Sequence, residues 1–250
     1  MNSILNITAY RFVHLVDPAG WRERIRVQAV AHSLKGTVLL AEEGINLCLA
    51  GAAADVRGWL AWLHAQAPFA RLDIKESRSD AVPFGKLLVK VKREIIRMNH
   101  PTIRPQAQRA PSVDAKTLAR WLNQGADDTG RPLALLDTRN GFEVDAGRMR
   151  GAVDWRLARF SDFPQALLAH RDELEGRTVV SYCTGGIRCE KAALFMAQAG
   201  VAHVLQLEGG ILKYFEETGG AHFDGSCFVF DERSALDATL APAATEAATV

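Results

Sequence analysis

The chain has 250 residues, 48% of them hydrophobic and 24% charged, which is the composition of a folded protein with one large domain or two smaller ones. A formal net charge of +1 excludes nucleic-acid binding through overall charge, so any such binding needs a local basic patch. No apolar run approaches the ~20 residues of a membrane span and the N-terminus lacks a signal-peptide pattern, so we expect a cytoplasmic protein without a membrane partner.

Residues 4–98 show the periodicities of a ferredoxin-like domain. Alternating or apolar stretches predict strands over 4–10, 36–41, 44–50 and 87–92, and helical spacing predicts helices over 21–34 and 54–65. The resulting order, β-α-β-β-α-β, is the split βαβ arrangement. The acidic turn Glu42-Glu43-Gly44, between the second and third strands, is expected to have a turn or domain-interface role.

Residues 99–113 contain three prolines and few apolar side chains, which is typical of a linker. A helix capped by Ser112 or Asp114 follows. Buried strands are then predicted over 133–137, 178–182 and 202–207, with helices between them. This alternation predicts an α/β domain with a central parallel sheet over 114–235, with its core at about 133–218. The Ala-rich tail, 236–250, is predicted to be disordered.

The four cysteines stand at positions 48, 183, 189 and 227, too few and too scattered for a disulfide framework. No C-x2-C pair or Cys/His cluster provides the spacing of a zinc site, so we expect no bound metal. Cys48 and Cys227 are expected to be small apolar residues of the core.

The motif Cys183-Thr-Gly-Gly-Ile-Arg-Cys189 lies between an apolar strand and a helix that we expect to begin at Arg188 or Cys189. Ligands of a parallel sheet bind beyond the carboxyl ends of its strands, and Cys183 follows such an end. Gly185 and Gly186 let the backbone turn so that N–H groups and the helix N-terminus point inward, which favours an anion. The motif therefore predicts a Cys183 thiolate with a lowered pKa rather than a structural cysteine.

The spacing within this motif separates two kinds of chemistry. A tyrosine-phosphatase loop has the pattern C-x5-R and holds a tetrahedral phosphate. In this chain the arginine comes one position earlier, at Arg188, and Cys189 takes its place. A smaller ring of N–H groups suits a terminal sulfur or another small anion, which disfavours a phosphatase.

Several motifs together carry a family resemblance. The stretches that resemble a rhodanese domain are Leu135–Arg139, Gly147–Val153, Tyr182–Lys191 and Glu208–Tyr214. The ten residues Cys183–Ala192, with Leu207–Ile211 and the later F-V-F-D-E-R (Phe228–Arg233), more narrowly resemble the bacterial tRNA uridine hydroxylases that carry a rhodanese domain. Gly36–Asn46 and Val89–Ile96 resemble the N-terminal domain of that family, so the resemblance covers about residues 4–235.

This resemblance implies oxygen-dependent 5-hydroxylation of the wobble uridine in tRNA, with molecular oxygen as co-substrate, an unidentified electron donor and no evident cofactor. It also implies that Cys183 is indispensable, as a thiolate or a persulfide. Longer family members carry a cysteine-rich tail after F-D-E-R, whereas this chain has an Ala-rich one, so a function of that tail does not transfer.

The expected active-site loop around Cys183 consists of Thr184, Gly185, Gly186, Ile187 and Arg188. Arg188 is expected to contact a substrate phosphate or to stabilise the thiolate. Cys189 is a candidate resolving thiol, with inward packing as the alternative. Asp137 and Arg139 follow a strand end at the same edge of the sheet, where we expect them to form an ion pair that braces the loop.

A basic stripe is the candidate RNA contact, formed by Lys90, Lys92, Arg93 and, from the second domain, Lys191. Lys90 and Lys92 share one strand face because they are two residues apart. Neighbouring cations that extend the stripe are Lys86, Arg97, His100 and Arg104. The alternative is an edge strand whose lysines prevent aggregation.

Two functions fit the cysteine loop. One is hydroxylation of a tRNA uridine, and the other is a rhodanese-type sulfurtransferase that forms a persulfide on Cys183. The basic N-terminal domain favours tRNA modification, because a plain sulfurtransferase has no evident use for it.

Overall fold

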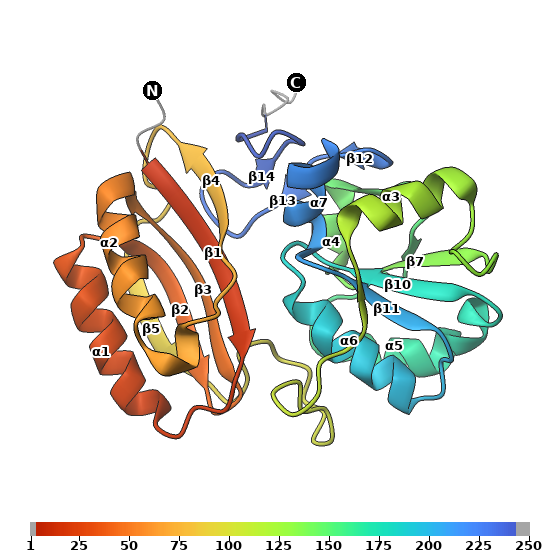
Figure 1. The fold of residues 1–250 in the computed structure, drawn as a ribbon, viewed down its shortest axis with the longest axis horizontal. Coiled ribbons are helices and arrows are strands. Elements are labelled where there is room, and N and C mark those ends of the chain that lie inside the picture. The colour runs from red at the N-terminus through yellow and green to blue at the C-terminus, as the bar shows by residue number, and fades with distance from the viewer. Residues whose placement is uncertain (1–3, 244–250) are drawn as a thin grey trace.

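The computed structural model describes residues 4–243, and the N-terminal half forms a five-stranded sheet with two helices on one face (Figure 1). The elements of this half are β1 (Ile4–Phe12), α1 (Pro18–Ala31), β2 (Lys35–Ala41), β3 (Gly44–Ala52), α2 (Ala53–His64), a 3-10 turn (Ala67–Phe69), β4 (Lys75–Ser79) and β5 (Leu87–Val91). The strand order is β4-β1-β3-β2-β5, and all pairs are antiparallel except β2 with β5.

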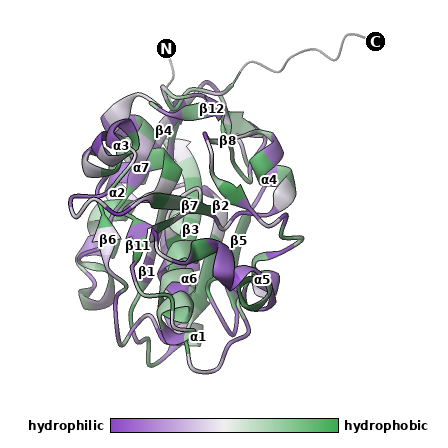
Figure 2. Cartoon of the chain, turned by 90° about the vertical axis from the view of Figure 1, so that its right-hand side faces the viewer, coloured by the Kyte–Doolittle hydropathy of each residue, from purple (hydrophilic) through white to green (hydrophobic). Residues whose placement is uncertain are grey.

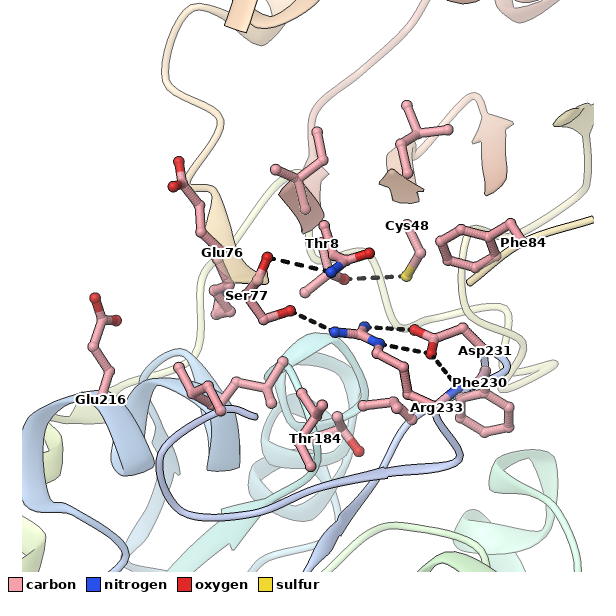
Figure 3. Close-up of a pocket in the computed structure, with 18 residues that line it drawn as sticks. Thr8, Cys48, Glu76, Ser77, Phe84, Thr184, Glu216, Phe230, Asp231 and Arg233 are labelled. Atoms are coloured by element: carbon pink, nitrogen blue, oxygen red, sulfur yellow. Dashed lines mark hydrogen bonds and ion pairs between the residues drawn. The ribbon is translucent and has the colours of Figure 1, made fainter. Parts of the chain in front are cut away.

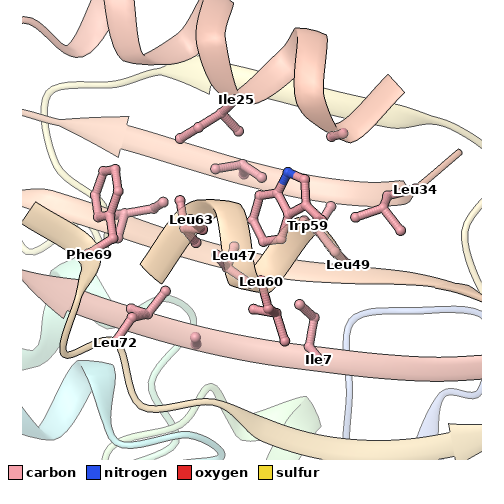
Figure 4. Packing of buried hydrophobic residues seen from close by; sticks show 14 of the residues in the cluster. Ile7, Ile25, Leu34, Leu47, Leu49, Trp59, Leu60, Leu63, Phe69 and Leu72 are labelled. Atoms are coloured by element: carbon pink, nitrogen blue, oxygen red, sulfur yellow. The ribbon is translucent and has the colours of Figure 1, made fainter. Parts of the chain in front are cut away.

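Side-chain alternation along β1 gives this sheet two different faces. Leu5 and Ile7 are buried in the core under the two helices, and the fully buried Trp59 of α2 packs among them (Figure 4). Thr8 and Tyr10 point the other way and line cavities shared with the second domain. Figure 1 shows the two helices against one face of this sheet and the second domain on the other side. The alternation therefore places a hydrophobic face towards the helices and a polar face towards the second domain.

The ferredoxin-like order is present as β4-β1-β3-β2, which confirms the expected fold but corrects one strand. The strand predicted over 87–92 exists as β5, yet it does not complete the βαββαβ order. It adds in parallel outside β2, and the fourth strand of the motif is β4. The sequence of β4, K-E-S-R-S, contains no apolar residue, so hydrophobic periodicity could not indicate it.

The second half contains the expected parallel sheet, in the order β6-β11-β10-β7-β9. Its strands and helices up to β10 are β6 (Ser112–Val113), α3 (Ala115–Gln124), β7 (Leu133–Asp137), α4 (Gly141–Asp145), β8 (Gly147–Met149), β9 (Val153–Asp154), α5 (Phe163–His170) and β10 (Thr178–Tyr182). The later ones are α6 (Ile187–Gln198), β11 (Val204–Leu207), α7 (Gly210–Thr218), β12 (Phe223–Gly225), β13 (Cys227–Phe228) and β14 (Ala235–Leu236). Two 3-10 turns, Phe160–Asp162 and Arg171–Leu174, flank α5.

Helices cover both faces of this sheet, as a parallel sheet requires. One hydrophobic cluster joins the strands to α3 and α7, and another joins them to α5 and α6. All five residues of β10 are buried, and Figure 2 shows hydrophobic strands inside a more hydrophilic surround. The carboxyl end of β10, which leads into Cys183, therefore emerges from the buried core of the domain.

Two segments are more ordered than the sequence indicates. Ser112–Val113, at the end of the expected linker, pairs with β11 as an edge strand. The predicted disorder is also wrong for residues 236–243, because β14 pairs with β13 and Leu236 bridges to Pro242. Residues 244–250 of that expected tail lie outside the described residues.

Lys191 of α6 joins the two domains. Its ammonium group donates to Glu43 (2.9 Å) in the β2–β3 turn, to Glu94 (2.7 Å) and to the Ile96 carbonyl (2.9 Å). The side chain is 1% exposed. The predicted RNA contact through Lys191 is therefore wrong, because its ammonium group is buried in ion pairs and a hydrogen bond at the domain interface.

A second connection comes from the segment after β13. Arg233 donates to Ser77 of β4 (2.7 Å) while it pairs with Asp231 (2.6 Å) (Figure 3). The Glu232 N–H donates to the Pro83 carbonyl (3.1 Å). The F-V-F-D-E-R segment thereby fastens the second domain to the first.

Candidate active site between the two domains

The cysteine loop connects β10 to α6, and its backbone bends around the sulfur of Cys183. Gly186 has φ +96°, a left-handed conformation that favours glycine, and its N–H donates to the Cys183 Sγ (3.2 Å). Helix α6 begins at Ile187, one residue earlier than predicted. The thiol therefore faces inward-pointing N–H groups at a helix N-terminus, as the motif indicates.

Helix α7 holds the other side of this loop. The N–H groups of Ile211 and Leu212 donate to the carbonyls of Cys183 (2.9 Å) and Thr184 (3.1 Å). Gly210, with φ +67°, allows this approach, because a Cβ there would lie 2.4 Å from the Cys183 carbonyl oxygen. The loop is thus fixed between two helix N-termini.

Opposing effects act on the pKa of Cys183, and those that stabilise the thiolate are the stronger. Burial raises the pKa, but a hydrogen bond from Cys189, the positive charge of Arg188 and the N–H groups of Arg188 and Gly186 lower it to about 5. Burial and the Cys183 charge raise the pKa of Cys189 well above its usual value. At neutral pH the pair is therefore one thiolate, on Cys183, and one thiol that donates to it.

Arg188 is buried and held by both oxygens of Glu143, at 2.6 and 2.7 Å. Burial alone would lower the pKa of Arg188, but this bidentate pair and the nearby Cys183 charge raise it. With Glu143 occupying its guanidinium, Arg188 is placed to stabilise the thiolate rather than to bind a phosphate. No local pattern indicates that Glu143 belongs to the site, although the capping-box spacing Asn140-x-x-Glu143 marks the start of α4.

Asp137 and Arg139 form an ion pair (2.6 Å) whose side chains are completely buried. Arg139 also donates to the carbonyls of Glu143 (3.2 Å) and Gly147 (2.6 Å). The pair therefore fixes the backbone that carries Glu143. It is connected to the cysteine loop through the Glu143–Arg188 pair and through Tyr182, the residue before Cys183, whose ring centroid lies 5.9 Å from the Arg139 guanidinium.

The Cys183 loop forms part of a pocket of about 420 Å³ whose walls come from both domains. The first domain and its connection contribute Thr8, Ala9, Tyr10, Asn46, Cys48, Lys75, Ile96 and Arg97. The second contributes Asn140, Arg159, Phe160, Ser161, Leu212, Phe230 and the loop residues Cys183, Thr184, Gly185, Ile187 and Arg188. A pocket of this size accommodates a small ligand or a single nucleoside.

Tyr10 is the residue of the first domain that lies against the loop. A side chain at position 186 would come within 3.0 Å of its hydroxyl, so Gly186 is required for this contact as well. Burial and the negative charges of Glu190 and Cys183 raise the pKa of Tyr10 well above its usual value. Tyr10 is therefore a neutral hydrogen-bond donor beside the thiolate.

The remaining predicted RNA contacts lie on the surface. Lys90, Lys92 and Arg93 are exposed at and after β5, the edge strand. A second cavity of about 670 Å³ is lined by Lys92, Arg93 and Arg97, and shares Arg97 with the Cys183 pocket. Three cations thus lie along one approach to the cysteine.

Two cysteines outside the loop have different environments. Cys227 is fully buried, as expected, and burial raises its pKa to about 12. Cys48 is only half-buried and lines the Cys183 pocket, so the expected core position is wrong. Burial raises the pKa of Cys48 too, in contrast to Cys183.

Two kinds of feature are absent from residues 4–243. In that part of the chain, no three His, Cys, Asp or Glu side chains gather closely enough to hold a metal ion. None of its helices combines the length and the apolar character needed to cross a membrane.

Two family models match this chain, one in each domain. A family described as the UPF0176 acylphosphatase like domain matches residues 4–95, and the rhodanese-like domain family matches residues 114–217. A solved rhodanese-like domain from Anabaena is 24% identical, with a TM-score of 0.37, and covers 46% of this chain and 79% of its own.

Full-length relatives are much more similar. A protein of Bordetella pertussis named tRNA uridine(34) hydroxylase is 65% identical, over 98% of this chain and 100% of its own length. A protein of Variovorax paradoxus with the same name is 60% identical, over 99% of this chain and 94% of its own length. The chain therefore belongs to the tRNA uridine(34) hydroxylase family.

Proposed function

We propose that this protein hydroxylates the wobble uridine of tRNA at C5 in a reaction that depends on Cys183. The observation that carries the proposal is the position of the Cys183 thiolate in a pocket built by two domains, one of which presents exposed cations beside it. Relatives named tRNA uridine(34) hydroxylase match this chain over 98% and 99% of its length. The substrate is tRNA, and the enzyme is an oxidoreductase that uses molecular oxygen.

The pocket has room for one base extruded from the anticodon loop, which is how base-modifying enzymes generally reach their target atom. The Cys183 thiolate adds to C6 of the uracil, forming an S–C6 bond and moving the electrons of the C5=C6 bond onto C5 and O4. Tyr10 is placed as a neutral donor for a developing oxygen charge in this pocket.

The electron-rich C5 then attacks molecular oxygen, and one proton is taken up to give a C5 hydroperoxide. An external two-electron donor and two further protons convert this group to a C5 hydroxyl and water. Loss of the C5 proton and expulsion of the Cys183 thiolate restore the C5=C6 bond. The net reaction consumes one oxygen molecule, two electrons and two protons.

A sulfurtransferase is the alternative for the loop alone, because an activated thiolate also accepts sulfane sulfur. The first domain argues against it, since Tyr10, Asn46 and Lys75 supply a wall that sulfur transfer from a small donor does not need. A persulfide on Cys183 remains compatible with the hydroxylase, in which it would act as the nucleophile.

The decisive experiment is nucleoside mass spectrometry of unmodified tRNA incubated with the purified protein, a reductant and ¹⁸O₂. We expect 5-hydroxyuridine carrying one ¹⁸O atom with wild type, none with Cys183→Ser, and retained product with Cys48→Ser as the matched thiol of the same pocket. Product formed by Cys183→Ser would contradict the thiolate mechanism. Absence of product with wild type, together with thiosulfate-dependent sulfur transfer, would replace the hydroxylase by the sulfurtransferase.

The exposed stripe of Lys90, Lys92 and Arg93 is proposed to follow the tRNA backbone towards the pocket. Each phosphate contact made by such a cation contributes about 0.7 to 0.9 to the slope of log affinity against log salt concentration. Alanine at two of these positions should therefore lower the slope by about 1.5. An unchanged slope would leave the stripe with its alternative role in preventing aggregation.

A further inference from the structure

In the F-V-F-D-E-R segment, one large apolar side chain is exposed between residues that are buried. Val229 is buried, and Asp231 and Arg233 form an ion pair with side chains 6% and 10% exposed. Phe230 lies between these anchored residues and is 65% exposed (Figure 3). The segment therefore holds a large apolar ring in a fixed position at the surface.

Phe230 belongs to a cluster of three phenylalanines from two elements. Its ring lies 5.2 Å from that of Phe228 and 6.2 Å from that of Phe142 on α4, and Phe142 lies 5.2 Å from Phe228. All three pairs are edge-to-face. Phe142 is itself 51% exposed, so two of the three rings face solvent. We name Phe142, Phe228 and Phe230 the aromatic ledge.

The aromatic ledge borders the pocket of the reactive cysteine. Phe230 lines the Cys183 pocket and also the neighbouring cavity that contains Lys92 and Arg93. Asn140, which lines the same pocket, is two residues before Phe142. Arg97 and Arg159 lie on the pocket wall as well. Exposed rings, cations and the thiolate thus share one opening.

We propose that the aromatic ledge stacks against a base of the RNA substrate, namely a nucleotide adjacent to the uridine that enters the Cys183 pocket. This inference rests on the proposed tRNA modification and adds the means by which the flanking base is held. Extruding the target base breaks its stacking with its neighbour, and aromatic side chains commonly replace such stacking in single-stranded RNA. The cations on the same opening suit the phosphates that accompany that base.

A protein partner is the competing occupant of exposed apolar rings. The aromatic ledge favours RNA because Phe230 lines the Cys183 pocket and also lines, together with Lys92, Arg93 and Arg97, the cavity beside it. Leu168 on α5, which is 67% exposed, lines neither the Cys183 pocket nor the neighbouring cavity.

The test uses an anticodon stem-loop RNA with 2-aminopurine placed immediately 3′ or, separately, 5′ of the target uridine. The proteins are wild type, Phe230→Leu, Phe142→Leu, the ring-preserving Phe230→Tyr, and Leu168→Ala as a control on a distant surface. Binding affinity and 2-aminopurine fluorescence are measured, and hydroxylation of the unlabelled stem-loop is followed in parallel. Thermal unfolding identifies any variant whose effect comes from misfolding, in which case the other leucine variant decides.

We expect wild type, Phe230→Tyr and Leu168→Ala to bind alike and to change the 2-aminopurine fluorescence at one of the two positions. Each leucine variant should bind about tenfold more weakly and lose most of that fluorescence change. The proposal would be overturned if both leucine variants bound the stem-loop and changed its fluorescence as wild type does. If such variants lost activity only in cells, that loss would indicate a protein partner instead. Failure of wild type to bind or hydroxylate the stem-loop would instead contradict the proposed function itself.

Discussion

Cys183 owes its chemistry to groups that come from different parts of the chain. Its own loop supplies the Gly186 N–H, α6 supplies Arg188 and Cys189, and α4 supplies the carboxylate of Glu143 that holds Arg188 in place. Burial alone would make this thiol inert, so the lowered pKa depends on all of these contacts together.

The first prediction concerns the titration of this thiol. With a pKa of about 5, the thiolate absorbance near 240 nm should appear as the pH rises through 5 and be complete at pH 7, whereas an ordinary cysteine titrates near 8.5. The difference between wild type and Cys183→Ser isolates this signal. A midpoint above pH 8 would show that burial dominates.

A second prediction separates two roles of Cys189. If its thiol serves as a donor to the thiolate, Cys189→Ala should raise the pKa of Cys183 by roughly 1 to 2 units, while Cys189→Ser, which keeps a donor, should change it little. The same absorbance titration measures both variants, and turnover on tRNA is recorded beside it. Equal loss of turnover in both variants, with no change in the Cys183 pKa, would instead favour the resolving thiol.

Among the elements, the turn before α7 matters as much as the cysteine loop that it supports. Gly209 and Gly210 have φ +73° and +67°, which directs the first N–H groups of α7 at the loop carbonyls. The loop conformation is thus shared between two helix starts that are far apart in sequence.

This arrangement predicts that Gly210→Ala is far more harmful than a glycine substitution at an uncrowded turn. A Cβ at Gly210 would meet backbone atoms of Cys183, Thr184 and Gly186 within 2.7 Å. We therefore expect Gly210→Ala to lower the free energy of unfolding by roughly 3 kcal/mol and to abolish activity. Gly176 has a similar φ (+71°) with nothing within 4 Å, and Gly176→Ala should cost about 1 kcal/mol and keep activity. Urea unfolding and the tRNA assay compare the two, and equal effects would refute the role assigned to the α7 turn.

Strands could be predicted from the sequence where their residues are apolar or alternate between apolar and polar. The strands β1, β2, β3, β7 and β10 are apolar or alternate, and each was expected. Strand β4 was not, because Lys75 and Ser79 are buried by contacts with other segments rather than by apolar character. Its identity depends on pairing with β1, which a local pattern cannot reveal.

Across the whole molecule, the active site is a property of the interface and not of either domain. Lys191 and Arg233 each reach across it, and Tyr10 closes the pocket from the opposite side. The sequence predicted Cys183 and its loop because those residues are consecutive. It could not predict Glu143, Tyr10 or the interface role of Lys191, since these depend on how distant segments pack.

The interface leads to a prediction for Lys191→Met. Removing this cation leaves Glu43 buried without its main partner, so the unfolding free energy should fall by about 3 kcal/mol at pH 7. Burial already raises the pKa of Glu43, and loss of Lys191 raises it further. A carboxyl with a raised folded-state pKa loses stabilisation as the pH rises through that pKa, so the deficit should be smaller near pH 4.

Urea denaturation at both pH values measures this effect, with Lys92→Met as the matched control. Lys92 is exposed, and its substitution should change the unfolding free energy by less than about 0.5 kcal/mol. If Lys191→Met were as stable as that control, the interdomain ion pairs would not be what fastens the domains.

The connection through residues 99–111 gives the divided pocket a further property. Because the two walls belong to one chain, they meet at an effective concentration set by the tether, which is in the millimolar range for short flexible connections. Reassembly after a transient separation is therefore intramolecular and does not depend on how much protein is present. The two walls that enclose Cys183, which is 1% exposed, are thus held together both by this tether and by the polar bonds of Lys191 and Arg233.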